Sequence, residues 1–165
     1  MPPVPESKIL KNIAPPSTSA ECTDFSGTWK GTCIEGDSEG NRSENEETIT
    51  VVQHQCQSLE FNGDQTYEIG GSATDTRTSG SNTMTNTTYY DWNAEKDAIT
   101  TRIMGTGRGL SQGFSYIMRF EGSFLVKMDG DKMLVAGKGS GEFIPVPTGE
   151  IAKSESSQTC TYVRQ

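Results

Sequence analysis

The feature that most constrains the fold is a two-residue alternation of apolar and polar side chains, which recurs along the chain after Phe25. It is clearest where Phe114, Tyr116, Met118 and Phe120 are separated by single residues. Because successive side chains of a β-strand point to opposite faces, this period predicts strands with one buried face. No segment has the length and the 3.6-residue period of a long helix, so we expect an all-β protein.

Turn-forming residues divide this alternating sequence into about eight to ten strands. Asn62-Gly63 and Asp129-Gly130 predict two tight hairpins, because these residue types accept positive φ. Stretches rich in glycine, serine, threonine or acidic residues are interpreted as loops, namely residues 35–47, 71–83 and 145–158. Gly105, Gly107 and Gly109 are expected to break a strand. Sequential hairpins at this spacing favour a single antiparallel up-and-down β-barrel, with a sandwich as the alternative.

Composition agrees with a barrel better than with a packed helical core. Hydrophobic residues make up 32% of the 165 residues, and a single-layer barrel needs apolar side chains only at alternate positions. Residues 1–21 contain five prolines and little apolar periodicity. We interpret them as a flexible leader and residues 22–165 as the barrel domain.

The charge balance limits the partners. The formal net charge is -8, which would repel phosphate backbones and anionic membranes, so we expect no nucleic-acid partner. No apolar run approaches the roughly 20 residues of a membrane-spanning helix. The N-terminus also lacks the apolar segment of a signal peptide, and we expect such a peptide to have been removed from a secreted or periplasmic protein.

Four cysteines indicate two disulfides. Cys22, Cys33, Cys56 and Cys160 lack the short spacings of a zinc site, and His54 is the only histidine. An even number of cysteines in a small, weakly hydrophobic domain is typical of a disulfide-stapled fold in an oxidising compartment. Of the three pairings that four cysteines allow, we favour Cys33–Cys56 between neighbouring strands and Cys22–Cys160 between the two ends of the domain.

One short motif resembles a known group of barrels. Phe25-Ser26-Gly27-Thr28-Trp29-Lys30 is similar to the first-strand G-x-W signature of the calycins, which include lipocalins, fatty-acid-binding proteins and avidins. The resemblance implies that Gly27 and Trp29 are structural residues, with Trp29 inside the closed end of the barrel. It also implies that an arginine, Arg164 or Arg119, covers the indole by cation–π stacking.

Catalytic and metal-binding patterns are weak. A Ser-His-acid triad would have to use His54, which lies in the middle of an expected strand. The acidic stretch 35–47 does not have the alternate acidic ligands or the glycine position of an EF-hand calcium loop. Gly105, Gly107 and Gly109 do not open a helix, so they do not form a phosphate loop. We therefore expect no enzyme, no metal site and no cofactor.

The aromatic and methionine side chains are the features that suggest a function. If the strands close, they face inward together and line either a packed core or a cavity for a small hydrophobic or amphipathic ligand. The candidates for ligand binding are Tyr67, Met84, Tyr90, Trp92, Phe114, Tyr116 and Met118. The alternatives are a protein-binding module acting through its loops or leader, such as a secreted protease inhibitor, and a structural envelope protein without a ligand.

Overall fold

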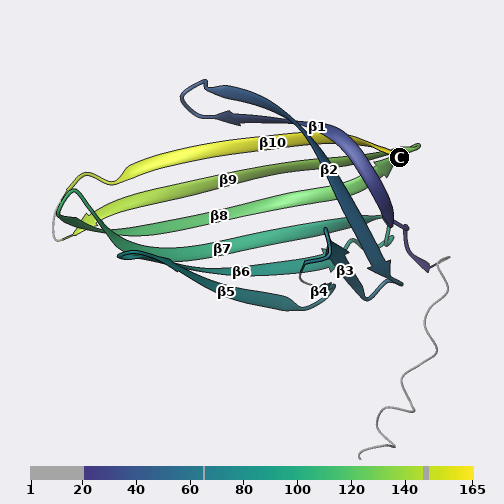
Figure 1. Cartoon of the computed structure of the whole chain (residues 1–165), viewed down its shortest axis with the longest axis horizontal. Coiled ribbons are helices and arrows are strands. Elements are labelled where there is room, and N and C mark those ends of the chain that lie inside the picture. Colours follow the sequence, from purple (N-terminus) through teal and green to yellow (C-terminus); the bar gives the residue numbers. More distant parts are fainter. Residues whose placement is uncertain (1–20, 65, 147–148) are drawn as a thin grey trace, which may run out of the picture.

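The protein is a single curled β-sheet. A computed structural model describes residues 21–64, 66–146 and 149–165, and these residues form ten strands (Figure 1). The strands are β1 Gly27–Asp37, β2 Arg42–His54, β3 Ser58–Phe61, β4 Thr66–Glu68, β5 Ser72–Ser79, β6 Asn82–Trp92, β7 Ala98–Ser111, β8 Phe114–Asp129, β9 Lys132–Val146 and β10 Ala152–Arg164. No helix within the described ranges is long and apolar enough to span a membrane.

The strand order is that of an up-and-down barrel. The sheet runs β4-β3-β2-β1-β10-β9-β8-β7-β6-β5, with antiparallel neighbours. Apart from β4 and β5, strands that follow one another in the sequence pair with each other, and β1 pairs with β10 to bring the two ends of the domain together. The barrel is nearly closed, with its seam between β4 and β5. The prediction of an all-β antiparallel barrel of eight to ten strands is confirmed. The expected leader lies, apart from Glu21, outside the described residues.

The expected loop over residues 35–47 is wrong, because it is mostly a β-hairpin. Strand β1 continues to Asp37 and β2 begins at Arg42. The Asp37 carboxylate accepts hydrogen bonds from the backbone N–H groups of Glu39 and Asn41 and from the Asn41 side chain, at 2.8 to 3.0 Å. These bonds, led by that of the Asn41 side chain, lower the pKa of Asp37. The Asp37 carboxylate therefore stabilises a tight turn within this acidic stretch.

Three other interruptions expected from the sequence are shorter than predicted or absent. Residues 71–83 contain β5 and the start of β6, joined at Gly80 and Ser81, and β9 and β10 extend into residues 145–158. Strand β7 continues through Gly105, where an added Cβ would lie 2.1 Å from the Phe120 ring. Glycine persists in this strand because the aromatic ring of the neighbouring strand occupies the space of its side chain. The sequence also missed the turn that ends β2 at His54, where Gln55 has a φ of 57°.

The core fills one end of the barrel, which we call the closed end. Its buried side chains come from the N-terminal segment and six strands: Phe25, Trp29, Cys33, Val51, Leu59, Ile99, Met133, Cys160 and Tyr162. Trp29 is completely buried, and its Nε1 donates a hydrogen bond to the Phe25 carbonyl at 2.9 Å. The Arg164 guanidinium lies over the indole, 4.7 Å from the ring centroid. Arg119 is exposed on β8, away from this contact.

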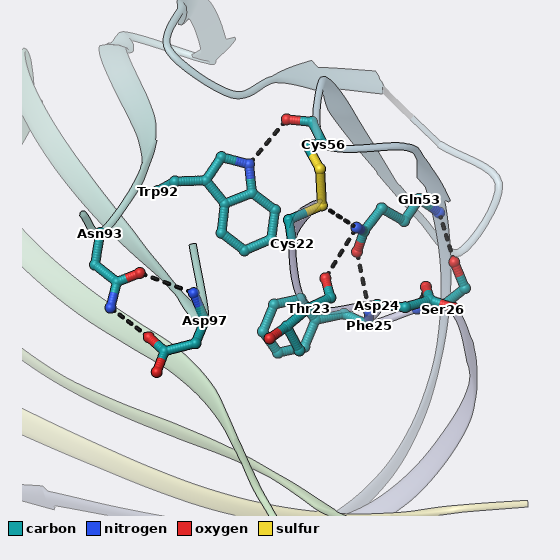
Figure 2. The surroundings of a disulfide bond; sticks show 10 residues. All are labelled: Cys22, Thr23, Asp24, Phe25, Ser26, Gln53, Cys56, Trp92, Asn93 and Asp97. Carbon is teal, nitrogen blue, oxygen red and sulfur yellow. Dashed lines mark hydrogen bonds between the residues drawn. A yellow bond between two sulfur atoms is a disulfide. The ribbon is translucent and has the colours of Figure 1, made fainter. Parts of the chain in front are cut away.

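Both disulfides differ from the pairing favoured by the sequence. The structure joins Cys33 to Cys160 and Cys22 to Cys56. The register of the β1–β2 hairpin places Asn45, and not Cys56, opposite Cys33, whereas β10 places Cys160 directly opposite it. Cys56 lies in the turn beyond β2 and is close to the segment that precedes β1 (Figure 2). The predicted disulfide pairing was wrong because the sequence does not show which strand lies beside β1 on the side away from β2.

The Cys22–Cys56 bond lies in a polar cluster that holds the segment before β1. Gln53 accepts a hydrogen bond from the Phe25 N–H at 2.9 Å and donates one to the Thr23 carbonyl at 3.0 Å (Figure 2). The Trp92 Nε1 donates to the Cys56 carbonyl at 2.8 Å. These contacts anchor the entry to the barrel and close its end beneath the core.

Candidate functional site

The register defines the inner face of the barrel. Directly opposed residues of antiparallel neighbours share a face, and one row of pairs runs through Cys33, Cys160, Val135, Val126, Ile99 and Trp92. Its members belong to the core or pack against it, so this face is the interior. Followed toward the other end of the strands, the interior changes from large apolar side chains to glycine and serine.

The closed end is packed and has no room for a ligand. Tyr67 and Tyr90 lie 4.9 Å apart between ring centroids, and Phe25 stacks on Trp92 at 6.0 Å. The void among these side chains measures about 20 Å³, far below the roughly 300 Å³ of a small-molecule site. Tyr67, Tyr90 and Trp92, which the sequence suggested as cavity residues, therefore pack in or against the core.

A cleft opens on the inner face beyond the core, and we call it the lumen cleft. Its volume is about 410 Å³. Its inner-face lining comes from β1 and β7 to β10: Glu35, Ile103, Phe120, Gly122, Phe124, Gly137, Gly139, Gly141, Ser154, Ser156 and Gln158. The cleft exists because small residues lie side by side on β8, β9 and β10. Gly122, Gly139 and Ser156 pair in one row across the strands, and Gly141 and Ser154 pair in the next, so few side chains fill the interior there.

Two phenylalanines form the apolar wall of the lumen cleft. An added Cβ on Gly105 would lie 2.1 Å from Phe120, and one on Gly137 would lie 2.1 Å from Phe124, so each ring lies across the glycine of a neighbouring strand. The Asn86 side-chain oxygen lies beside Phe120 over Gly105 and is buried without a hydrogen-bond partner. The wall is therefore flat and apolar, with one unused acceptor at its edge.

The opposite wall of the lumen cleft is polar. Strand β10 contributes Ser154, Ser156 and Gln158, and β1 contributes Glu35. The Gln158 Nε2 donates a hydrogen bond to the Glu35 carboxylate at 3.0 Å. Ser154 and Ser156 are exposed, so their hydroxyl groups can donate hydrogen bonds to a ligand or accept them from it without losing an internal partner.

The remaining candidates lie near the mouth of the barrel. Tyr116 is buried, stacks on Phe143 with centroids 4.5 Å apart, and donates its hydroxyl hydrogen to Asn82 at 2.9 Å. Met84 and Met118 share a register row of the inner face with Gly107 between them. Phe114 is 72% exposed at the end of β8 and joins neither the core nor the cleft.

The sequence missed the residues that form the cleft itself. Ile103, Phe124 and the glycines of β8 and β9 were not chosen as site residues, and Phe120 was noted only for its periodicity. Glycines alternate along residues 105–109 and again along 137–141. That alternation could have indicated the cleft from the sequence, because it leaves one face of a strand without side chains.

A buried tyrosine links the core to β2. The Tyr162 hydroxyl donates to the Glu47 carboxylate, and Tyr162 also packs over Gly31. Burial, followed by the bond to Glu47, raises the pKa of Tyr162 well above its usual range. Burial also raises the pKa of Tyr90 to about 12. Glu47 lies beside Cys33 and Cys160, but both sulfur atoms are in a disulfide and do not offer thiolate ligands to a metal.

Two larger depressions lie on the outer face of the same strands. They measure about 680 and 640 Å³ and share Met104, Glu121, Ser140 and Glu155. Their rims alternate basic and acidic side chains, including a Lys153–Glu142 ion pair at 3.7 Å. Most of their lining side chains point away from the barrel interior, whereas the apolar rings of the lumen cleft lie on the inner face, so the lumen cleft is the better candidate.

The chain shows little similarity to known proteins in sequence or in structure. No model of a known protein family matches the chain, and no curated protein matches its sequence. Among solved structures, an S-type phycobiliprotein lyase from Guillardia theta is similar at 8% identity, covering 86% of this chain and 88% of that one, with a TM-score of 0.37.

Proposed function

We propose that the lumen cleft binds one small amphipathic molecule with a flat apolar part. The observation that carries this proposal is the contrast within the interior, where a packed core at one end gives way to a cleft of about 410 Å³. That volume lies in the range of about 300–1,000 Å³ found for small-molecule sites. A barrel built only for its own stability would be expected to fill this space with side chains.

The two walls indicate the chemistry of the ligand. The rings of Phe120 and Phe124 offer apolar surface to a planar or alkyl group. The hydroxyls of Ser154 and Ser156, opposite them, offer hydrogen bonds to a polar group. Glu35 and the net charge of -8 disfavour an anionic group, so a neutral or cationic polar end fits best.

We also propose a compartment and a family for this protein. Two disulfides support a secreted or periplasmic location, because such bonds persist in oxidising compartments. The calycin resemblance is supported by Trp29 at the closed end beneath Arg164. We propose binding rather than catalysis, since His54 is exposed and its nearest acidic partner is Glu60 at 3.8 Å.

Two substitutions on the same strand test the lumen cleft. Gly139 lies on the inner face, where an added Cβ would be 3.2 Å from the Ser156 hydroxyl and 3.4 Å from the Glu121 carbonyl. Gly139→Leu therefore extends into the cleft after a small shift of its neighbours. Ala136→Leu is the matched control, because Ala136 is exposed on the outer face of the same strand and lines neither the lumen cleft nor the two outer depressions. The probe is N-phenyl-1-naphthylamine, a neutral aromatic dye that fluoresces in apolar surroundings.

The wild-type protein and Ala136→Leu are expected to bind the dye with one-to-one stoichiometry, and Gly139→Leu to weaken binding at least about tenfold, or ~1.4 kcal/mol. Near-ultraviolet circular dichroism verifies that both variants are folded. If all three proteins bind the dye equally, or if none binds it, the lumen cleft is not a ligand site. If the dye binds as expected, native mass spectrometry after exposure to a lipid and metabolite extract identifies the natural ligand.

A further inference from the structure

The strand ends farthest from the core carry exposed apolar side chains. They lie around the β7–β8 turn and the β9–β10 connection, at the left end of the barrel in Figure 1. We call this group the apolar tip: Leu110, Phe114, Ile117, Val146 and Ile151. Phe114 is 72% exposed, Leu110 53% and Ile151 51%. Single exposed apolar residues are ordinary, but here several gather at one end.

Residues of the apolar tip occupy both faces of the sheet. Phe114 pairs with Ser111 and lies in register with the inner face. Leu110 and Val146 both flank Ser115 and lie on the outer face, with Ile117 two residues further along β8. A tip that is apolar on both faces is suited to a medium that surrounds it, such as the interfacial region of a bilayer.

The apolar tip is also electrically neutral in an acidic protein. Residues 108–117 and 149–151 contain one basic residue, Arg108, and one acidic residue, Glu150. These formal charges cancel, whereas the whole chain carries -8. A zwitterionic bilayer therefore accepts the tip without repulsion, and an anionic bilayer repels the remainder of the protein.

We propose that the apolar tip inserts shallowly into a zwitterionic lipid surface and holds the mouth of the lumen cleft against it. Phe114 is the deepest residue, because it is the most exposed and lies next to the Gln112-Gly113 turn. This interaction goes beyond the proposed ligand binding and does not need a bound ligand. It would also supply an apolar ligand with a path between the bilayer and the cleft.

The experiment measures binding of the full chain to phosphatidylcholine vesicles by flotation. Phe114→Ser removes the main contact, and Val163→Ser is the matched control, since Val163 is 44% exposed but lies at the closed end. Phe114→Trp and Val163→Trp serve as depth probes with brominated lipids, which quench indoles that enter the bilayer.

The wild-type protein and Val163→Ser are expected to float with the vesicles, and Phe114→Ser to bind at least about tenfold more weakly. Quenching should occur for Phe114→Trp and not for Val163→Trp. Vesicles with added phosphatidylglycerol should bind more weakly, and salt should reduce that difference. Equal flotation of Phe114→Ser and wild type, the absence of flotation, or a dimer that Phe114→Ser dissociates would each overturn the proposal. Because vesicle binding is measured without the dye, its failure leaves the test of the lumen cleft intact.

Discussion

Replacing Cys33 and Cys160 by alanine is expected to lower the free energy of unfolding more than replacing Cys22 and Cys56. The Cys33–Cys160 bond spans 127 residues and the Cys22–Cys56 bond spans 34. In the loop-entropy model, the longer bond removes about 4.9 kcal/mol of chain freedom from the unfolded state and the shorter bond about 3.8 kcal/mol.

The position of the longer bond adds to its importance. Cys33 and Cys160 are both buried and face each other across the β1–β10 pair, which joins the two ends of the domain. Small domains have a total stability of about 5–15 kcal/mol. Loss of this single bond is therefore expected to remove a large part of the stability, whereas the shorter bond only anchors the segment before β1.

Guanidinium unfolding of both double-alanine variants, followed by tryptophan fluorescence and circular dichroism, measures the two effects. Loss of the Cys33–Cys160 bond should also make the free energy of unfolding fall more steeply with denaturant concentration, because the unfolded chain expands and exposes more surface. The reasoning is refuted if the Cys33–Cys160 variant is as stable as the wild type, or if it is more stable than the Cys22–Cys56 variant.

Two further results are expected. Arg164→Gln should lower the free energy of unfolding by about 0.5–1 kcal/mol and change the emission of Trp29, because the guanidinium no longer covers the indole; unchanged emission would contradict this. The free energy of unfolding should fall as the pH rises from about 10 to about 12, since the pKa of Tyr90 is raised to about 12 in the folded state and the unfolded chain loses its tyrosine proton first. Tyr162, whose pKa is also raised, contributes to the same fall. Tyr90→Phe should therefore reduce the slope of this part of the stability profile, and an unchanged profile in that variant would contradict the contribution of Tyr90.

The candidate site was only partly accessible to sequence reasoning. The period-two pattern of β8 correctly placed Tyr116, Met118 and Phe120 on the same face of the strand. The pattern did not show how far along the barrel each residue lies, because periodicity gives a face and not a depth. Tyr90 was therefore chosen as a ligand-binding candidate and Phe120 was not, although Tyr90 packs against the core and Phe120 lines the lumen cleft.

By itself, the sequence determined the local features of this protein. Alternation of apolar residues specifies strands, and the low apolar content favours a single-layer barrel. Asn62-Gly63 specifies a turn, and Gly130 does so together with Asp131 rather than with Asp129, which ends β8. These properties depend on residues that are neighbours in the chain, so they can be recognised without a structure.

Only the tertiary structure decided the disulfide pairing, the continuity of the glycine-containing strands and the position of the lumen cleft. Each depends on which strand lies beside which. Cys33 meets Cys160 because β10 is the second neighbour of β1. Gly105 and Gly137 remain within strands because Phe120 and Phe124 lie across them from β8. The space left between these rings and the serines of β10 follows from contacts between residues distant in the sequence.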